Sequence, residues 1–233
     1  METLSNPHHF RKMLAGLAMV LAPLLVLVGA ILHPSSAADA ASELAAAGGA
    51  TGRWTAAHLV LLASVVIAVP AVLGLMHMLR ERRATYGHLG GGLALMGLMA
   101  FTGLLAIELV IGQMADMGSR LAMVALLARI GSTAAITVPF LFGTFLFGLG
   151  TIVLGLGLYE ARAVEWWQAL ALAVAGVALV IAGPVASSAV AIVGAAILLV
   201  GQGSIGMMVL AESDADWEHT PESRGFRPLM GAR

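Results

Sequence analysis

Residues 133–158, TAAITVPFLFGTFLFGLGTIVLGLGL, decide the fold class of this chain. They form a run of 26 residues without a charged side chain. About 20 apolar residues are enough to cross the hydrocarbon core of a bilayer as a helix. A helix also satisfies every backbone hydrogen bond within its own segment, which lipid requires. The run therefore predicts a transmembrane helix.

Similar apolar stretches flank this run, at residues 13–32, 57–78, 89–112, 167–185 and 189–210. The whole chain is 60% hydrophobic and 11% charged, whereas an ordinary soluble domain has about 45–50% apolar and 25% charged residues. We expect an all-α, polytopic bundle of six transmembrane spans embedded in a lipid bilayer. A short segment at 1–12 precedes this 13–210 domain, and a flexible tail at 211–233 follows it.

The distribution of basic residues predicts the orientation of the spans. A six-span topology places nine of the 12 Lys and Arg residues on the side of the termini. Arg53, Arg120 and Arg129 lie on the other side. Cytoplasmic loops carry the excess of basic residues, so both termini are predicted to be cytoplasmic. Trp54 is then expected to anchor the helix at the interface on the outer side of the membrane.

The first span has an alternative interpretation as a signal peptide cleaved near residues 35–38, Ser-Ser-Ala-Ala. The apolar stretch at 13–32 is longer than the 7 to 15 residues of a signal-peptide core, which favours a retained helix. Whether this helix is retained or cleaved stays open at the level of sequence.

Charge and cysteine content exclude several classes of function. The formal net charge is −1, so no basic excess points to nucleic acid. The chain has no Cys, which removes disulfides, thiolate metal sites and thiol nucleophiles. Neither a catalytic triad motif nor a phosphate-binding glycine loop is present. The sequence favours a non-enzymatic protein.

Two outer loops each contain a short predicted helix. Residues 37–47 are rich in Ala and are followed by Gly48 and Gly49. Residues 121–130 are apolar, with Ser119 as the expected N-cap and Gly131 as the expected stop. Both segments are too short to cross a bilayer, so we expect them to lie at the outer surface.

Glycines in the run at 133–158 form two stripes. Gly143, Gly150 and Gly157 recur every seven residues, and Gly148 and Gly155 repeat at the same interval. A step of seven returns to almost the same face of a helix. Small residues let transmembrane helices approach closely. This helix is therefore predicted to pack closely against two neighbours, one on each stripe.

Glu108 is the one formal charge well inside a predicted span. A carboxylate in that position costs free energy unless it is paired, protonated or wetted. It is therefore the first candidate for ligand binding. The alternative is that it reaches lipid headgroups or Arg120.

Four histidines lie at the ends of predicted spans, His33 and His58 on the outer side and His77 and His88 on the inner side. One pair in each leaflet is what a two-haem b-type electron carrier needs, although a histidine at an interface needs no ligand. His33, His58 and Glu108 together could also hold zinc with an open position. We expect no cofactor, with haem b or zinc as the alternatives.

Two short runs carry a resemblance to a known group of proteins. The residues His-Pro at 33–34 and Trp-Thr-Ala-Ala-His at 54–58 are similar to a pattern in uncharacterised six-helix inner-membrane proteins of bacteria. The run GLMHMLR at 74–80 is also similar. The likeness covers about residues 13–112. It implies the six-helix topology and the bacterial plasma membrane, and it transfers no activity.

Three functions are compatible with these observations. The first is a small carrier or membrane helper subunit that uses an outward-facing polar cluster of Glu108, His33 and His58. The second is a membrane redox or metal protein that uses the four histidines. In the third, residues 212–218 and the tail recruit a cytoplasmic partner. The sequence names neither substrate nor oligomeric state.

Overall fold

The computed structural model describes residues 7–34, 39–117, 119–182 and 187–218. Every regular element in these ranges is a helix. The helices are α1 (Pro7–Leu32), α2 (Ala40–Gly49), α3 (Thr51–Leu79), α4 (Ala84–Ala115), α5 (Arg120–Ser132), α6 (Ala134–Glu160), α7 (Trp166–Ala182), α8 (Ser188–Ala211) and α9 (Asp214–Glu218). The predicted all-α fold class is confirmed. Several helices continue past their predicted apolar cores, because polar residues at both ends also adopt helical backbone.

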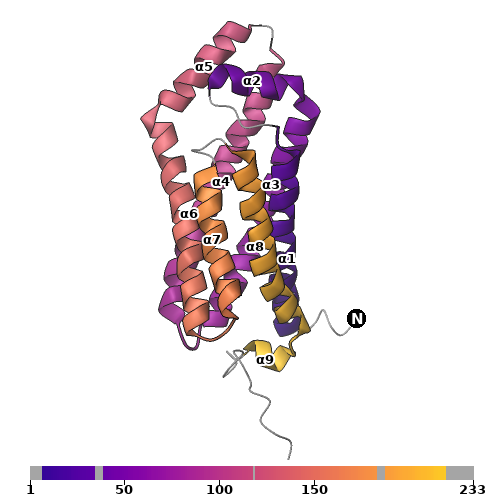
Figure 1. Ribbon diagram of the computed structural model, residues 1–233, viewed down its shortest axis with the longest axis vertical. Coiled ribbons are helices and arrows are strands. Elements are labelled where there is room, and N and C mark those ends of the chain that lie inside the picture. The colour runs from indigo at the N-terminus through magenta and orange to yellow at the C-terminus, as the bar shows by residue number, and fades with distance from the viewer. Residues whose placement is uncertain (1–6, 35–38, 118, 183–186, 219–233) are drawn as a thin grey trace, which may run out of the picture.

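The six long helices lie side by side (Figure 1), and their packing contacts close into a ring. Going round it, α1 packs against α3, α3 against α4, α4 against α6, α6 against α7, α7 against α8, and α8 against α1. Among the described helices, α1, α3, α4, α6 and α8 are long and apolar enough to cross a membrane. The helix α7 is apolar but has 17 residues. The chain is thus built as a multi-pass membrane protein.

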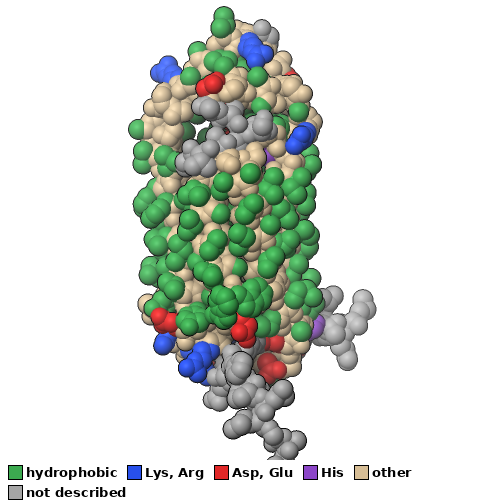
Figure 2. Space-filling model, viewed as in Figure 1, with side chains coloured by type: hydrophobic (Ala, Val, Ile, Leu, Met, Phe, Trp, Pro, Cys, Tyr) green, Lys and Arg blue, Asp and Glu red, His purple; other side chains and the backbone are tan. Residues whose placement is uncertain are grey.

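The outer surface of the ring is apolar between its two ends. Figure 2 shows hydrophobic side chains over the middle of the visible face and charged side chains gathered at the ends. The exposed stripe of α1 consists of Leu14, Leu17, Leu21, Leu24, Val28 and Ile31. The buried face of the same helix carries Ala15, Ala18 and Ala22. Large residues outside and small residues inside are typical of helices that associate by close packing in lipid.

The two glycine stripes of α6 face two different neighbours, as predicted. A Cβ atom added at Gly150 would meet the backbone of Ala94 and Gly90 on α4. A Cβ atom added at Gly155 would meet the carbonyl oxygen of Ala169 on α7, at 2.8 Å. The absence of side chains at these glycines therefore allows α6 to lie in backbone contact with both helices.

The helices α2 and α5 lie together at one end of the ring, here called the α2/α5 end. Asp39 is the N-cap of α2, and its carboxylate accepts from the amides of Ala41 and Ser42 at 2.9 Å. The helix was predicted to begin at residue 37, which lies outside the described residues, as does the candidate cleavage site at 35–38. The predicted stop at Gly131 is wrong, because α5 continues through this glycine to Ser132.

The short helix α9 docks against the opposite end, here called the terminal end. The ammonium Nζ of Lys12 lies 2.6 Å from Asp214 Oδ1 and donates to the carbonyl of Glu212 at 2.7 Å. The indole of Trp217 is buried and stacks on the ring of His77 at 4.5 Å. A buried ammonium and a buried indole thus hold residues 212–218, the start of the predicted tail at 211–233, against the ends of α1 and α3.

Acid should release α9. Hydrogen bonds from Lys12 and from His9 hold the pKa of Asp214 below its ordinary value of 3.8. A carboxyl with a lowered pKa stabilises the fold above its ordinary pKa, and this contribution is lost as the pH falls through the folded value. We expect Trp217 to become exposed below about pH 3.8, seen as a change in tryptophan emission that a Trp217→Phe variant lacks. In Asp214→Asn, α9 should be released already at neutral pH, and an unchanged acid transition in that variant would contradict the assignment.

Candidate functional site

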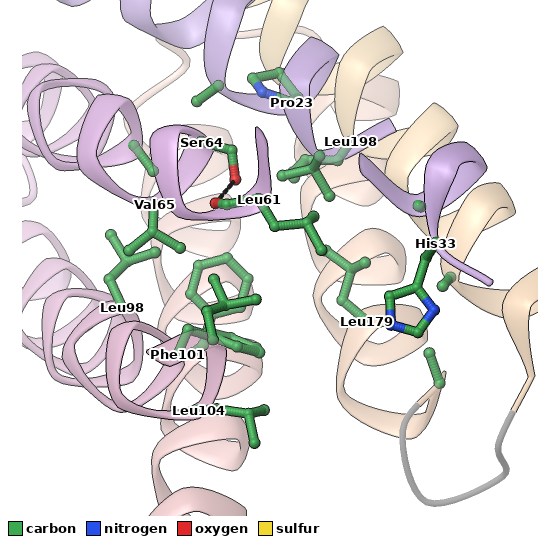
Figure 3. Close-up of a pocket in the computed structure, with 18 of the residues that line it drawn as sticks. Pro23, His33, Leu61, Ser64, Val65, Leu98, Phe101, Leu104, Leu179 and Leu198 are labelled. Atoms are coloured by element: carbon green, nitrogen blue, oxygen red, sulfur yellow. Dashed lines mark hydrogen bonds between the residues drawn. The ribbon is translucent and has the colours of Figure 1, made fainter. Parts of the chain in front are cut away.

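A cavity of about 380 Å³ lies at the centre of the ring, and all six long helices line it. The lining residues of α3 follow one stripe of the helix; they are Trp54, His58, Leu61, Ser64, Val65, Ala68, Val72 and Leu75. From His58 to Leu75 this stripe is about 26 Å long at 1.5 Å per residue. In Figure 3, Val65, Leu98 and Phe101 form one wall, and Leu179 and Leu198 lie across from them. The cavity therefore follows the helix axes and is mainly apolar.

The α2/α5 end of the cavity is polar, because Glu43, Glu108, His33 and His58 line it there. The rings of His33 and His58 lie edge to face, with their centroids 4.9 Å apart. His58 is 1% exposed. Its Nε2 atom lies 3.8 Å from Oε2 of Glu108. The three residues that the sequence singled out, from α3, α4 and the end of α1, are thus brought to one place.

Trp54 holds this polar end together. Its indole Nε1 donates to the carbonyl of Glu108 at 2.7 Å, which ties α3 to α4. Its ring centroid lies 4.6 Å from that of His58 and 5.3 Å from that of His33. The expectation that Trp54 anchors the membrane interface is wrong, because the indole is 2% exposed and packs among side chains of α2, α4 and α5.

The carboxylate of Glu108 is mostly buried, with 20% of the side chain exposed. Its Oε2 atom is buried and has no hydrogen-bond partner among the described residues. The 3.8 Å to His58 Nε2 is beyond hydrogen-bonding distance. Arg120, the alternative partner considered from the sequence, is exposed at the start of α5. The contacts described for Glu108 are therefore with Trp54 and His58.

Both histidines donate to backbone carbonyls. Nδ1 of His58 donates to the carbonyl of Trp54 at 2.7 Å, and Nδ1 of His33 donates to that of Pro34 at 2.6 Å. A carbonyl oxygen accepts only, so each Nδ1 carries the hydrogen. Burial lowers the pKa of His33, and the nearby charge of Arg53 lowers it further. A neutral His33 therefore presents Nε2 as an acceptor.

Two other charged residues complete the electrostatics of this end. Burial raises the pKa of the Glu43 carboxyl. The guanidinium of Arg53 donates to the carbonyls of Leu32 at 2.6 Å, Ile31 at 3.1 Å and His33 at 3.3 Å. Arg53 thus caps the C-terminal carbonyls of α1. Sequence reasoning missed Glu43 as a lining residue, since only the docking of α2 brings it to the cavity.

The geometry bears on the two cofactor alternatives. Among the described residues, no group of three or more His, Cys, Asp or Glu side chains is arranged to hold a metal ion. The rings of His33 and His58 touch each other, so a haem would need them to separate. At the other end, Nε2 of His77 donates to the carbonyl of Trp217 at 3.0 Å, while His88 is exposed. His77 and His88, the inner pair of histidines, therefore lie in different environments.

Comparisons of this chain with models of protein families, with curated proteins and with solved structures give no match.

Proposed function

We propose that this chain crosses the bacterial plasma membrane six times, with both termini in the cytoplasm and the α2/α5 end outside. The position of α7 in the ring supports a sixth span, because glycines of α6 and α8 contact it at several levels. Gly148 and Gly155 face Val180 and Ala169, and Gly194 and Gly201 face Ala178 and Ala171. The excess of Arg and Lys at the terminal end supports the orientation. The connection at 183–186 lies outside the described residues.

Within that topology we propose a non-enzymatic binding protein or small carrier that takes up a small ligand from the outer side. One observation carries this proposal: the buried, unpartnered Oε2 of Glu108 lies at the polar end of a mainly apolar cavity. A buried carboxylate oxygen without a partner is costly. A ligand that supplies the missing partner would recover that cost on binding, and the apolar walls would hold the rest of the molecule.

Filling the cavity tests this proposal. Ala68 lines the cavity, whereas Ala63 on the same helix is exposed on the outer surface. We expect Ala68→Leu to occupy space that a ligand needs, and Ala63→Leu to leave it free. Native mass spectrometry of protein purified in mild detergent should find a co-purifying small molecule on the wild-type chain and on Ala63→Leu. Ala68→Leu should lose most of it.

A second cavity-filling variant and a folding check complete this experiment. Ala191 on α8 lines the same cavity, so Ala191→Leu should also lose the bound molecule. Circular dichroism and gel filtration establish that each variant retains its helices and its size. Equal occupancy in properly folded Ala68→Leu and Ala63→Leu would contradict the proposal.

A further inference from the structure

We propose that the ligand of the central cavity is a single-chain amphiphile with a primary ammonium head, held between Glu108 and His58, and with its apolar chain along the stripe of α3. This inference rests on the proposed function, namely that the cavity is a ligand site. It adds the chemical class of the ligand.

Most polar side chains that line the cavity already use a hydrogen-bond donor within the protein. Six of these residues donate to backbone carbonyls: His33 to Pro34, Trp54 to Glu108, His58 to Trp54, Ser64 to Leu61, Thr151 to Gly148, and Gln202, by an amide hydrogen, to Met19. The oxygens of Ser64 and Thr151 and the Nε2 atoms of the neutral histidines keep free lone pairs. The cavity therefore offers mainly acceptors, and the complementary ligand brings donors.

Acidic side chains dominate the polar end of the cavity. Glu43 and Glu108 both line it. The nearby cation, Arg53, donates to three carbonyls at the end of α1. An ammonium group carries a positive charge and three donors, and it has no acceptor. Its hydrogen bonds to a carboxylate are charge-assisted and correspondingly strong.

The arrangement of Glu108 and His58 suits such a head. Oε2 of Glu108 and Nε2 of His58 are 3.8 Å apart, too far for a direct hydrogen bond. Nδ1 of His58 donates its hydrogen to Trp54, so Nε2 of His58 is an acceptor, and it faces Oε2 of Glu108. One ammonium group can donate to both atoms at once. A carboxylate or carbonyl head would instead bring further acceptors to a site that already offers them.

The shape of the cavity determines the rest of the ligand. Below the polar end the walls consist mainly of Leu, Val, Ala and Phe side chains. Figure 3 shows Leu61, Phe101 and Leu179 projecting toward the same central space. The lining follows α3 for about 26 Å and the volume is about 380 Å³, so the space is long and narrow. A single alkyl chain matches this shape.

Equilibrium binding of tritiated dodecylamine to the full chain in lipid nanodiscs tests the inference, with empty nanodiscs as background. Competitors with the same alkyl chain and different heads distinguish the effect of charge from that of N–H donors. Dodecyltrimethylammonium has the positive charge without N–H donors, dodecanol is neutral, and dodecanoate is an anion. We expect saturable binding of dodecylamine, weaker competition by dodecyltrimethylammonium and dodecanol, and the weakest by dodecanoate.

Glutamine variants locate the head. Glu108→Gln should weaken dodecylamine binding at least about tenfold, the loss of one hydrogen bond to a charged group. The same variant should bind dodecanol with an affinity within about threefold of the wild-type value. Glu43→Gln removes the second carboxyl group of the polar end and should also weaken dodecylamine binding. This variant replaces Glu108→Gln in the test if Glu108→Gln does not fold. Glu160→Gln, at the terminal end of α6, is the matched control and should bind as the wild type does.

The outcomes separate this inference from the proposed function. If dodecanol or dodecanoate binds as tightly as dodecylamine, or Glu108→Gln binds dodecylamine normally, the ammonium head is wrong while the cavity remains a ligand site. If no probe binds saturably, the single-chain amphiphile is wrong, and the mass spectrometry of Ala68→Leu and Ala63→Leu decides whether the cavity is a ligand site. If Ala68→Leu binds all probes as the wild type does, both this inference and the proposed cavity site are wrong.

Discussion

Replacing Trp54 by alanine should destabilise the protein by about 3–5 kcal/mol, the usual cost of truncating a fully buried aromatic residue. The indole is 2% exposed and packs within a cluster that includes Leu44, Ile111 and Leu127. Its removal leaves a cavity and also leaves the carbonyl of Glu108 without its donor. The free energy of unfolding, measured by denaturant titration in mixed micelles, checks this value.

Two further variants isolate the cause. Trp166→Ala removes an indole that is 64% exposed, so it should change the free energy of unfolding by less than about 0.5 kcal/mol. Trp54→Phe keeps most of the ring and removes the N–H donor, so it should cost about 0.5–1.5 kcal/mol. Similar losses in Trp54→Ala and Trp166→Ala would show that Trp54 does not join α2, α4 and α5.

Replacing Gly150 by alanine should destabilise the protein by about 1–3 kcal/mol, the range for overpacking a tight interface. The added methyl group would contact the backbone of Gly90 and Ala94 on α4. Backbone atoms of a helix cannot move aside as a flexible side chain does, so α4 and α6 would have to separate. The same unfolding titration, together with the melting temperature, measures this effect.

Gly92 on α4 provides the matched control. A Cβ atom added there meets nothing within 4 Å, whereas one added at Gly90, two residues earlier, meets the amide nitrogen of Leu154 at 2.8 Å. Gly92→Ala should be neutral or stabilising by up to about 1 kcal/mol, because alanine favours the helix over the unfolded chain. Gly90→Ala should resemble Gly150→Ala. Equal effects of Gly90→Ala and Gly92→Ala would refute close backbone packing between α4 and α6.

The stripes of α6 show what was predictable from sequence. Helical periodicity alone assigns Gly150 and Gly155 to two faces, because a helix has a fixed rotation per residue. Composition alone predicted an all-helical membrane protein, since lipid restricts the backbone to few structures. The closure of the six helices into a ring was not predictable, because it depends on which faces pair across the whole chain.

The candidate site was predictable in part. Glu108 stood out because a charge within an apolar run is rare. His33 and His58 stood out because His33 ends the first predicted span and His58 begins the second. Nothing in the sequence brings Glu43 to these residues, since α2 reaches the cavity by packing against α3, α4 and α5. Trp54 was placed at the interface by a statistical preference of tryptophan. The carbonyl of Glu108 offers its indole a partner in the interior, and this tertiary contact overrides the preference.

The ring has a consequence for how the protein assembles during synthesis. In the proposed six-span topology, each long helix except α1 can pack against the preceding long helix as soon as it enters the bilayer, but the contact between α1 and α8 forms only when α8 has entered. Until α1 and α8 make contact, the helices form an open arc whose concave face is accessible to acyl chains. Its apolar lining is thus solvated by lipid from the start and needs no protection from water. When α1 and α8 come into contact, they displace lipid from the lining. An amphiphile from the surrounding leaflet can be enclosed in the same step.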